Sequence, residues 1–238
     1  MQDMAAFFQS VRHEELLQRA AKHGFPLVLA RLAIAAYTSP RRVVIRGPIA
    51  PPVWANRGVV PGCTLATYLI KVYYIDSLDE LAHNHEHIQL CAYVDDFHVG
   101  VDGEWGVIIS RAVAAVVDLA YLVDKDLRGS LALHKAATVA SSDKLAKEIR
   151  RRLGVLGGPQ CLSTEALGID YAPGRVRRLW VAKGKQSKRF ATVVARGNRL
   201  LRLSRIAGAR ASKLVMQGSV PAALYGAAVT GVSDTQLK

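Results

Sequence analysis

In the stretch IQLCAYVDDFHVGVDG, residues 88–103, a pair of acids interrupts two alternating apolar patterns. Apolar and polar residues alternate over 88–93 and again over 97–101. A period of two is typical of β-strands, whose successive side chains point to opposite faces. We therefore predict a β-hairpin whose tight turn, residues 94–96, carries both acids.

The two acids, Asp95 and Asp96, are adjacent although like charges repel. Asp is common in turns because its side chain bonds to nearby backbone, which explains one acid better than two. Carboxylates are also the ligands that Mg²⁺ prefers, and two such ions about 4 Å apart can hold the attacking and leaving oxygens of a phosphoryl transfer. That chemistry needs a further acid from a neighbouring strand, and Asp3 is the candidate.

The other elements follow from apolar spacing and from turn residues. We predict helices over 13–24, 26–37, 62–81, 106–123 and 142–154, a short hairpin over 41–58, and a strand over 131–141. With the first residues taken as a strand, the order is strand, helix, hairpin, helix, strand. This is the split βαββαβ arrangement, an α+β fold with an antiparallel sheet and helices on one face.

Charge is distributed unevenly along the chain. It has 32 Lys or Arg and 19 Asp or Glu, which gives a net charge of +13. Thirteen of the basic residues and none of the acidic ones lie within 174–213, so the remaining 19 of each sign balance. An acid-free basic segment is typical of contact with a polyanion, whereas ordinary solubilising surfaces mix both signs. A solvated helical face is the plainer alternative.

Cysteine use and hydropathy bear on the compartment. The three cysteines are widely spaced and lack the paired pattern of a zinc site, and the sequence shows no secretory signal peptide. We therefore expect a reduced intracellular setting, either nucleus or cytoplasm. We also expect no contact with a membrane, because acids at 76–80 and at Asp118 interrupt the two longest apolar segments.

Several motifs together resemble the palm and part of the thumb of a reverse transcriptase, of the kind found in non-LTR retrotransposons and group II introns. YVDD at 93–96 matches the Tyr-x-Asp-Asp box of that family, and DMAAFFQSV at 3–11 is similar to its first palm motif. Four further segments resemble its Gly-rich motif, lysine strand, primer-grip turn and post-thumb segment: RGVVPGCTLAT (57–67), LALHKAATVAS (131–141), EALGIDY (165–171) and GSVPAALYGAAVTGVSD (218–234). Their shared order over nearly the whole chain makes the resemblance specific.

The resemblance implies an RNA-directed DNA polymerase that uses two Mg²⁺ ions, with Mn²⁺ as an alternative. Its partners would be an RNA template, a DNA primer and deoxynucleoside triphosphates. Asp3 and Asp95 would bridge the ions, with Asp96 in a supporting role and the backbone carbonyl of Met4 as a further ligand. Lys135 would donate a proton to the leaving pyrophosphate or stabilise its charge; an exposed strand lysine is the plainer alternative.

The same resemblance assigns the nucleotide-binding residues. Phe8 falls at the steric-gate position, where an aromatic ring excludes a 2′-hydroxyl. Pro61, Gly62 and Tyr93 would lie beside the nascent base pair, because glycine lets the backbone approach closely. The family motif usually reads Gly-x-x-Gln-Gly, and Pro61 stands here at the Gln position.

The implied domains are a palm, a linker and a thumb-like region. The palm covers 1–160 with a helical and hairpin insertion at 12–57, a primer-grip-like hairpin and linker cover 161–185, and a basic helical region covers 186–238. In the hairpin, Leu167 and Gly168 would contact nucleic acid. In the thumb-like region five arginines would contact phosphates: Arg189, Arg196, Arg199, Arg202 and Arg205.

Apolar residues of the thumb-like segment are expected to pack inward. They are Phe190, Val193, Val194, Leu200, Leu201 and Leu203. Only Met1 and Gln2 precede Asp3, whereas the fingers of the family would lie upstream. We therefore expect the fingers to be missing, as in a fragment, a gene-model artefact or a decayed retroelement copy.

Two other functions stay open at this point. One is a nucleic-acid-binding remnant of a retroelement that keeps the fold without turnover. The other is a different palm-type two-metal enzyme, such as an RNA-dependent RNA polymerase or a nucleotide cyclase. Phe8 at the steric-gate position argues against the ribonucleotide substrates of such enzymes. The sequence does not indicate an oligomeric state.

Overall fold

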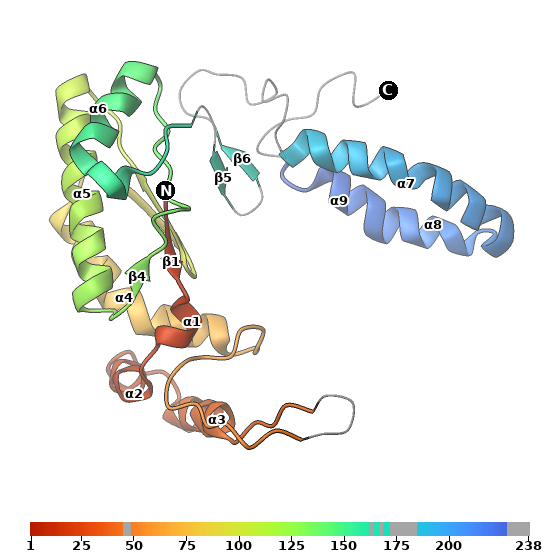
Figure 1. Cartoon of the computed structure of the whole chain (residues 1–238), viewed down its shortest axis with the longest axis horizontal. Helices are drawn as coiled ribbons and strands as arrows, with labels where there is room; N and C mark the ends of the chain where they lie inside the picture. The colour runs from red at the N-terminus through yellow and green to blue at the C-terminus, as the bar shows by residue number, and fades with distance from the viewer. Residues whose placement is uncertain (45–48, 162–163, 167–168, 172–184, 228–238) are drawn as a thin grey trace. The chain divides into compact units, whose positions relative to one another are not determined.

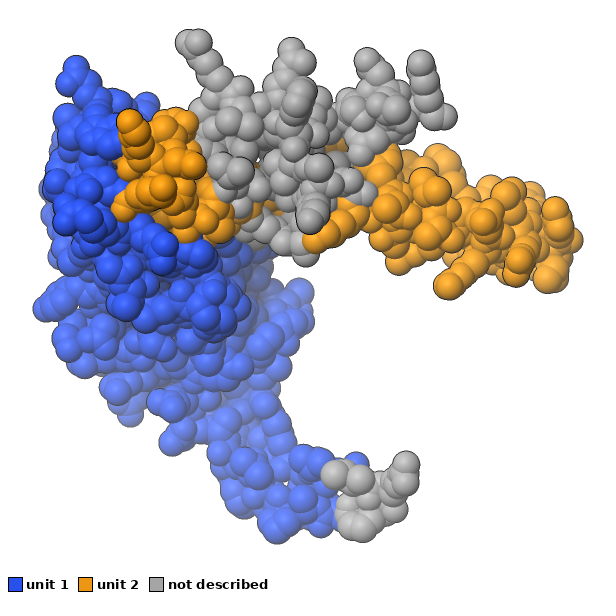
Figure 2. All heavy atoms as spheres, turned by 45° about the horizontal axis from the view of Figure 1, so that its top comes forward, with its two compact units in different colours: residues 1–136, 148–159 blue, residues 137–147, 160–238 orange. Residues whose placement is uncertain are grey.

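The computed structural model describes residues 1–238 except 45–48, 162–163, 167–168, 172–184 and 228–238 (Figure 1). The chain forms two compact units, residues 1–136 with 148–159 and residues 137–147 with 160–238 (Figure 2). The elements of the first part of the chain are β1 (Gln2–Ala5), α1 (Phe7–Ser10), α2 (His13–Lys22), α3 (Leu27–Thr38), α4 (Ala66–Asn84), β2 (Gln89–Tyr93), β3 (Asp96–Gly100), α5 (Trp105–Lys125), β4 (Ser130–Leu131), α6 (Asp143–Leu153) and the 3₁₀ turn η1 (Gly154–Gly157). Those of the second part are β5 (Thr164–Ala166), β6 (Ile169–Tyr171), α7 (Lys185–Ala207), α8 (Arg210–Leu214), the π-helical turn η3 (Val215–Ser219) and α9 (Val220–Leu224).

The first unit is built on a four-stranded antiparallel sheet with the strand order β2-β3-β1-β4. The predicted hairpin of β2 and β3 is confirmed, although Asp96 belongs to β3 and only Val94 and Asp95 form the turn. Strand β1 lies between the hairpin and β4, as the split order predicts. The α+β class and the antiparallel sheet are therefore confirmed.

Helices cover one face of this sheet (Figure 1). Phe97 of β3 and Met4 of β1 are fully buried in the hydrophobic core, and the ring of Tyr74 from α4 lies 6.2 Å from that of Phe97. Burying such a side chain contributes about 1.5–3 kcal/mol to folding. In β2 the alternate residues Gln89, Cys91 and Tyr93 are exposed. The period of two thus places a buried row toward the helices and a polar row on the opposite face.

A polar network joins α2 to α4 and to the end of α5 within the same unit. Arg19 pairs with Asp126 at 2.9 Å and lies over the ring of Tyr73, 4.9 Å from its centroid. The Tyr73 hydroxyl donates to Glu15 at 2.9 Å. Burial, with the neighbouring Glu15 carboxylate, raises the pKa of Tyr73 to about 12. Because these partners satisfy one another, polar groups can stand beside the core.

The strand predicted over 131–141 is wrong. Strand β4 pairs with β1 over Ser130 and Leu131 alone, and a turn follows in which the Lys135 N–H donates to the carbonyl of Ala132 at 2.8 Å. The ladder ends at Leu131 because the chain turns at 133–135, where Lys135 Nζ lies 2.5 Å from Oδ2 of Asp3. Tertiary contacts of this kind override strand propensity.

The predicted hairpin over 41–58 consists, in its described part, of two isolated bridges, Arg41 to Val53 and Val44 to Ile49. The helices predicted over 13–24, 26–37 and 142–154 are confirmed as α2, α3 and α6. Helix α4 begins at Ala66, four residues later than predicted, because Gly62 has a φ of +84° that no helix contains.

Helix α5 is long and apolar enough to cross a membrane by length and composition, so Asp118 alone does not interrupt this apolar segment. The expectation of no membrane contact stays a prediction. A core helix passes the same test. Here Leu119 and Val123 of α5 belong to the hydrophobic core.

In the second unit α7 packs against α8 and α9 as an antiparallel pair (Figure 1). Phe190, Val193 and Leu200 are half-buried, as predicted. Val194 and Leu201 are 74% and 63% exposed, so their predicted burial is wrong. A helix pair covers only a narrow stripe of each helix, and Val194 and Leu201 lie outside it. Leu203, also predicted to be buried, is 37% exposed.

Candidate active site

Two of the predicted acids meet on neighbouring strands. Asp3 of β1 pairs directly with Asp96 of β3. Directly opposite residues in an antiparallel pair point to the same face, with Cβ atoms about 4.5–5.5 Å apart. The N–H of Met4 donates to the carbonyl of Asp95 at 2.9 Å, so the hairpin turn also adjoins β1. The register thus gathers all three acids at one end of the sheet.

The turn that carries Asp95 is strained. Val94 has a φ of +58°, in the left-handed region that β-branched residues avoid. Such a residue costs on the order of 1–3 kcal/mol and persists where its surroundings hold it. The side chain of Val94 packs against the hydrophobic core, which accounts for the retained conformation.

Lys135 completes the group. Its Nζ lies 2.5 Å from Oδ2 of Asp3, whose side chain is 8% exposed. The N–H of Ala132 donates to the carbonyl of Asp3 at 2.6 Å, and this bond holds the Lys135 turn beside β1. The hydrogen bond to Asp3, together with the charge of that carboxylate, raises the pKa of Lys135. Lys135 is therefore a cation at neutral pH.

The acids perturb one another. Burial raises the pKa of Asp96, and the charges of Asp3 and Asp95 raise it further, while Lys135 opposes them. Oδ1 of Asp3 is buried and has no hydrogen-bond partner. A buried unpaired carboxylate oxygen is costly unless a cation or donor satisfies it. The site therefore holds more negative charge than Lys135 alone neutralises.

Within the part of the chain that the structure describes, no three His, Cys, Asp or Glu side chains are placed so that they could hold a metal ion. The residue types nevertheless fit a divalent cation. Asp3 offers the unpaired Oδ1, and Asp95 and Asp96 add hard oxygen donors beside it. The Lys135 ammonium, bonded to Oδ2 of Asp3, would oppose the charge of such a cation.

Comparison with known proteins gives no independent indication of what the three acids bind. No protein-family model and no curated protein matches the chain. What the group of acids can do follows from its own chemistry, which is that of carboxylates beside a lysine.

The predicted nucleotide-binding residues fall into two places. Tyr93 is 56% exposed and pairs with Asp96, so it shares the face of the acids. Phe8 is half-buried at the edge of the core, and its carbonyl accepts a hydrogen bond of 2.7 Å from the N–H of Val59. The exposed Pro61 and Gly62 follow Val59 along the chain. The Gly-rich segment thus lies beside α1.

In the second unit the arginines of α7 do not share one face. Arg196, Arg199, Arg202 and Arg205 are exposed and recur every three residues, whereas Arg189 is half-buried. Three residues fall short of a 3.6-residue turn, so each arginine is rotated by about 60° and the last lies about 180° from the first. Leu167 and Gly168 lie outside the described residues, although β5 and β6 on either side pair as a hairpin.

Two further residues make contacts near the candidate sites that the sequence did not predict. His13 Nε2 lies 2.8 Å from the carbonyl of Gly58 and ties α2 to the Gly-rich segment. Tyr225 lies under the guanidinium of Arg189, 4.6 Å from ring centroid to Cζ. The sequence has no signal for either contact, since His13 reads as a helix start and Tyr225 as the end of an apolar run.

Proposed function

We propose that the chain is the palm and thumb-like part of an RNA-directed DNA polymerase of a retroelement. The reaction would be transfer of a deoxynucleotide from its triphosphate to the 3′-hydroxyl of a primer. The observation that carries the proposal is the direct pairing of Asp3 with Asp96 beside the turn that holds Asp95. A turn alone accounts for one acid better than for three acids that converge from two strands and a turn.

The buried Oδ1 of Asp3 supports a cation-binding role for these acids. Two Mg²⁺ or Mn²⁺ ions, when bound, would lower the pKa of the primer hydroxyl and neutralise charge on the triphosphate. Asp3 and Asp95 would hold them, with Asp96 and the carbonyl of Met4 in support. Repulsion among the three carboxylates would favour such binding.

The remaining residues would position the reactants. The primer O3′ bonds to the α-phosphorus, the bond to the bridging oxygen breaks, and pyrophosphate leaves. Lys135 Nζ would donate a proton or a hydrogen bond to that leaving group, and its raised pKa favours charge stabilisation over proton release. Phe8 would exclude a 2′-hydroxyl, and Tyr93 would lie beside the incoming nucleotide. Catalysis of this kind is largely positioning.

The second unit supports a nucleic-acid partner. No Asp or Glu occurs between Asp170 and Asp234, and the exposed arginines of α7 lie in this interval. Phosphate contacts from such residues are independent of sequence and weakened by salt. An RNA template paired with a DNA primer would meet this surface.

A second function is favoured by the Lys135–Asp3 ion pair, which neutralises one acid without a metal. A nucleic-acid-binding protein without turnover could keep this arrangement as a structural ion pair. The two functions differ in whether the acids bind divalent cations and support nucleotide addition.

Primer extension separates the two. The full chain would be incubated with a labelled DNA primer on an RNA template, Mg²⁺ and either deoxynucleotides or ribonucleotides. We expect extension with deoxynucleotides, loss of extension in Asp3→Ala, and acceptance of ribonucleotides in Phe8→Ala. Binding of the primer–template without extension by any form would favour the second function. Extension with ribonucleotides by the unaltered chain would indicate a different palm-type polymerase.

A further inference from the structure

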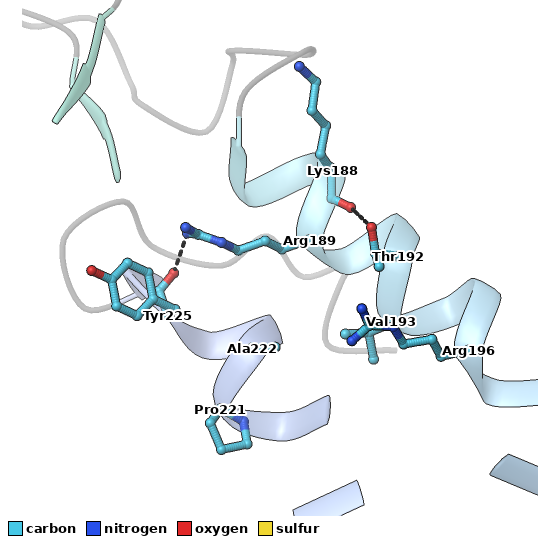
Figure 3. Close-up of a pocket in the computed structure, with 8 residues that line it drawn as sticks. All are labelled: Lys188, Arg189, Thr192, Val193, Arg196, Pro221, Ala222 and Tyr225. Carbon is cyan, nitrogen blue, oxygen red and sulfur yellow. Dashed lines mark hydrogen bonds between the residues drawn. The ribbon is translucent and has the colours of Figure 1, made fainter. Parts of the chain in front are cut away.

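A groove of about 600 Å³ lies between α7 and α9 in the second unit (Figure 3). Its floor includes Val193 of α7 and Pro221 and Ala222 of α9, so it is largely apolar. Ligand pockets of small molecules span about 300–1,000 Å³ and combine an apolar lining with a few polar groups. The groove is therefore large enough for a nucleotide.

Cations border the groove on the α7 side. Lys188, Arg189 and Arg196 line it, and Thr192 lies between them. Lys188, Thr192 and Arg196 are spaced by four residues, which keeps them on one face of the helix. No acid lies within 171–233, so within this interval of sequence nothing offsets their charge. The occupant that this charge selects is an anion.

An aromatic ring closes one end of the groove. Tyr225 is 49% exposed, and Arg189 extends from α7 over its ring, with Nη1 donating to the Tyr225 carbonyl at 3.1 Å (Figure 3). This bond fixes the planar guanidinium and the ring against each other. Flat groups such as nucleobases stack on both.

We infer that the α7–α9 groove binds an unpaired nucleotide of a single-stranded nucleic acid. The base stacks against the Tyr225–Arg189 pair, and the flanking phosphates contact Lys188 and Arg196. An acidic peptide or an anionic lipid surface would contact the cations but would bring no planar base to stack on the aromatic pair. The inference rests on the proposed nucleic-acid partner and is independent of the chemistry of the acids.

The test measures binding by fluorescence anisotropy. The full chain is titrated into labelled oligodeoxythymidine and into an abasic oligonucleotide of equal length, which has the phosphates without the bases. Tyr225→Ala should weaken oligodeoxythymidine binding about tenfold, because stacking of one base is worth about that factor. It should leave abasic binding and the salt dependence unchanged. Tyr225→Phe, which keeps the ring, should bind as the unaltered chain does.

Two arginines of α7, one in the groove and one on the opposite side, provide a matched pair of charge-removing variants. Arg196→Gln should weaken binding of both oligonucleotides and reduce the salt slope by about 0.7, the value for one phosphate contact on a single strand. Arg205→Gln, on the opposite side of α7, should have a smaller effect. Circular dichroism of each variant checks that the helices persist.

Equal affinity of Tyr225→Ala and the unaltered chain for oligodeoxythymidine would overturn the inference, as would an equal loss on the abasic strand. Preferential binding of an acidic peptide or of anionic vesicles that survives Tyr225→Ala would assign the groove to that partner instead. Asp95→Ala should abolish primer extension but keep oligodeoxythymidine binding. Failure of the polymerase proposal and failure of the groove are thereby distinguishable.

Discussion

Lys135 Nζ lies 2.5 Å from Oδ2 of Asp3, so a half-exposed lysine neutralises a buried acid at the point where a metal would bind. In Lys135→Met the competing cation is gone. We expect Mn²⁺ to bind about thirtyfold more tightly, because a unit charge about 4 Å from a dication changes the binding free energy by about 2 kcal/mol in water. Electron paramagnetic resonance of free Mn²⁺ measures this affinity, and Lys144→Met, at an exposed position of α6, is the control.

The same variant should be less stable in a chelator, because Asp3 keeps its charge without a partner. Added Mg²⁺ should restore thermal stability to Lys135→Met more than to the unaltered chain. Unchanged Mn²⁺ affinity together with unchanged stability would mean that the ion pair is incidental.

Asp96 should make the stability of the unit depend on pH. Its pKa is raised by burial and by the charges of Asp3 and Asp95, so folding favours the protonated form. This stabilisation is present below the ordinary pKa of Asp and is lost as pH rises through the raised value. Asp96→Asn, which cannot ionise, should gain thermal stability relative to the unaltered chain between about pH 4 and pH 7.

The expected gain at neutral pH is about 2 °C in Tm, small because solvent still reaches Asp96. Thermal unfolding in a chelator measures it, and saturating Mg²⁺ should shrink it. Asp102→Asn, at an exposed position, serves as the comparison. A difference between Asp96→Asn and the unaltered chain that is constant with pH would refute the electrostatic account.

Two glycines with the same backbone conformation should differ in how much stability is lost when alanine replaces them. Gly154 and Gly158 have φ of +57° and +56°, so alanine at either costs about 1–2 kcal/mol. A Cβ at Gly158 would lie 2.1 Å from the carbonyl oxygen of Ala136, whereas one at Gly154 meets nothing within 4 Å. Chemical denaturation should show a loss of several kcal/mol for Gly158→Ala only. Similar losses would contradict the packing of Gly158 on Ala136, next to Lys135.

The arginines of α7 should not be equivalent. Arg196 and Arg199 lie toward the groove side of the helix, whereas Arg202 and Arg205 turn progressively away. Arg196→Gln with Arg199→Gln should reduce the salt slope of single-strand binding by about 1.4, the value for two phosphate contacts. Arg202→Gln with Arg205→Gln should reduce it less. Equal slopes for the two pairs would mean that charge alone, without position, determines binding.

The sheet could be predicted because its signals are local. Alternation at 88–93 and 97–101 defined the hairpin, and the turn acids placed its end. That Asp3 meets the end of the hairpin followed from the strand order, since a split βαββαβ sheet sets the first strand beside the hairpin, but its direct pairing with Asp96 depends on a register that the order does not fix. The helices of the first unit followed from apolar spacing and stop residues.

Other features depend on contacts that a sequence does not display. Strand β4 ends at Leu131 because the chain turns at 133–135, so LALHKAATVAS has the pattern of a strand although Lys135 lies in a turn. The ion pair of Lys135 with Asp3 joins residues 132 positions apart. Val194 and Leu201 have the helical spacing of core residues, but in the described part of the second unit a single helix pair leaves them exposed. Tyr225 could not be identified as a candidate binding residue from the sequence, because its contact with Arg189 is seen only in the structure.

The most direct measurement of the central claim is Mg²⁺-dependent primer extension on an RNA template by the unaltered chain, Asp95→Ala and Asp102→Ala. Asp95 stands in the strained turn beside β1, whereas Asp102 is an exposed acid after the hairpin. The account predicts extension by the unaltered chain and by Asp102→Ala, and none by Asp95→Ala at equal primer–template binding. Equal extension by Asp95→Ala, or none by the unaltered chain while it binds the primer–template, would contradict it.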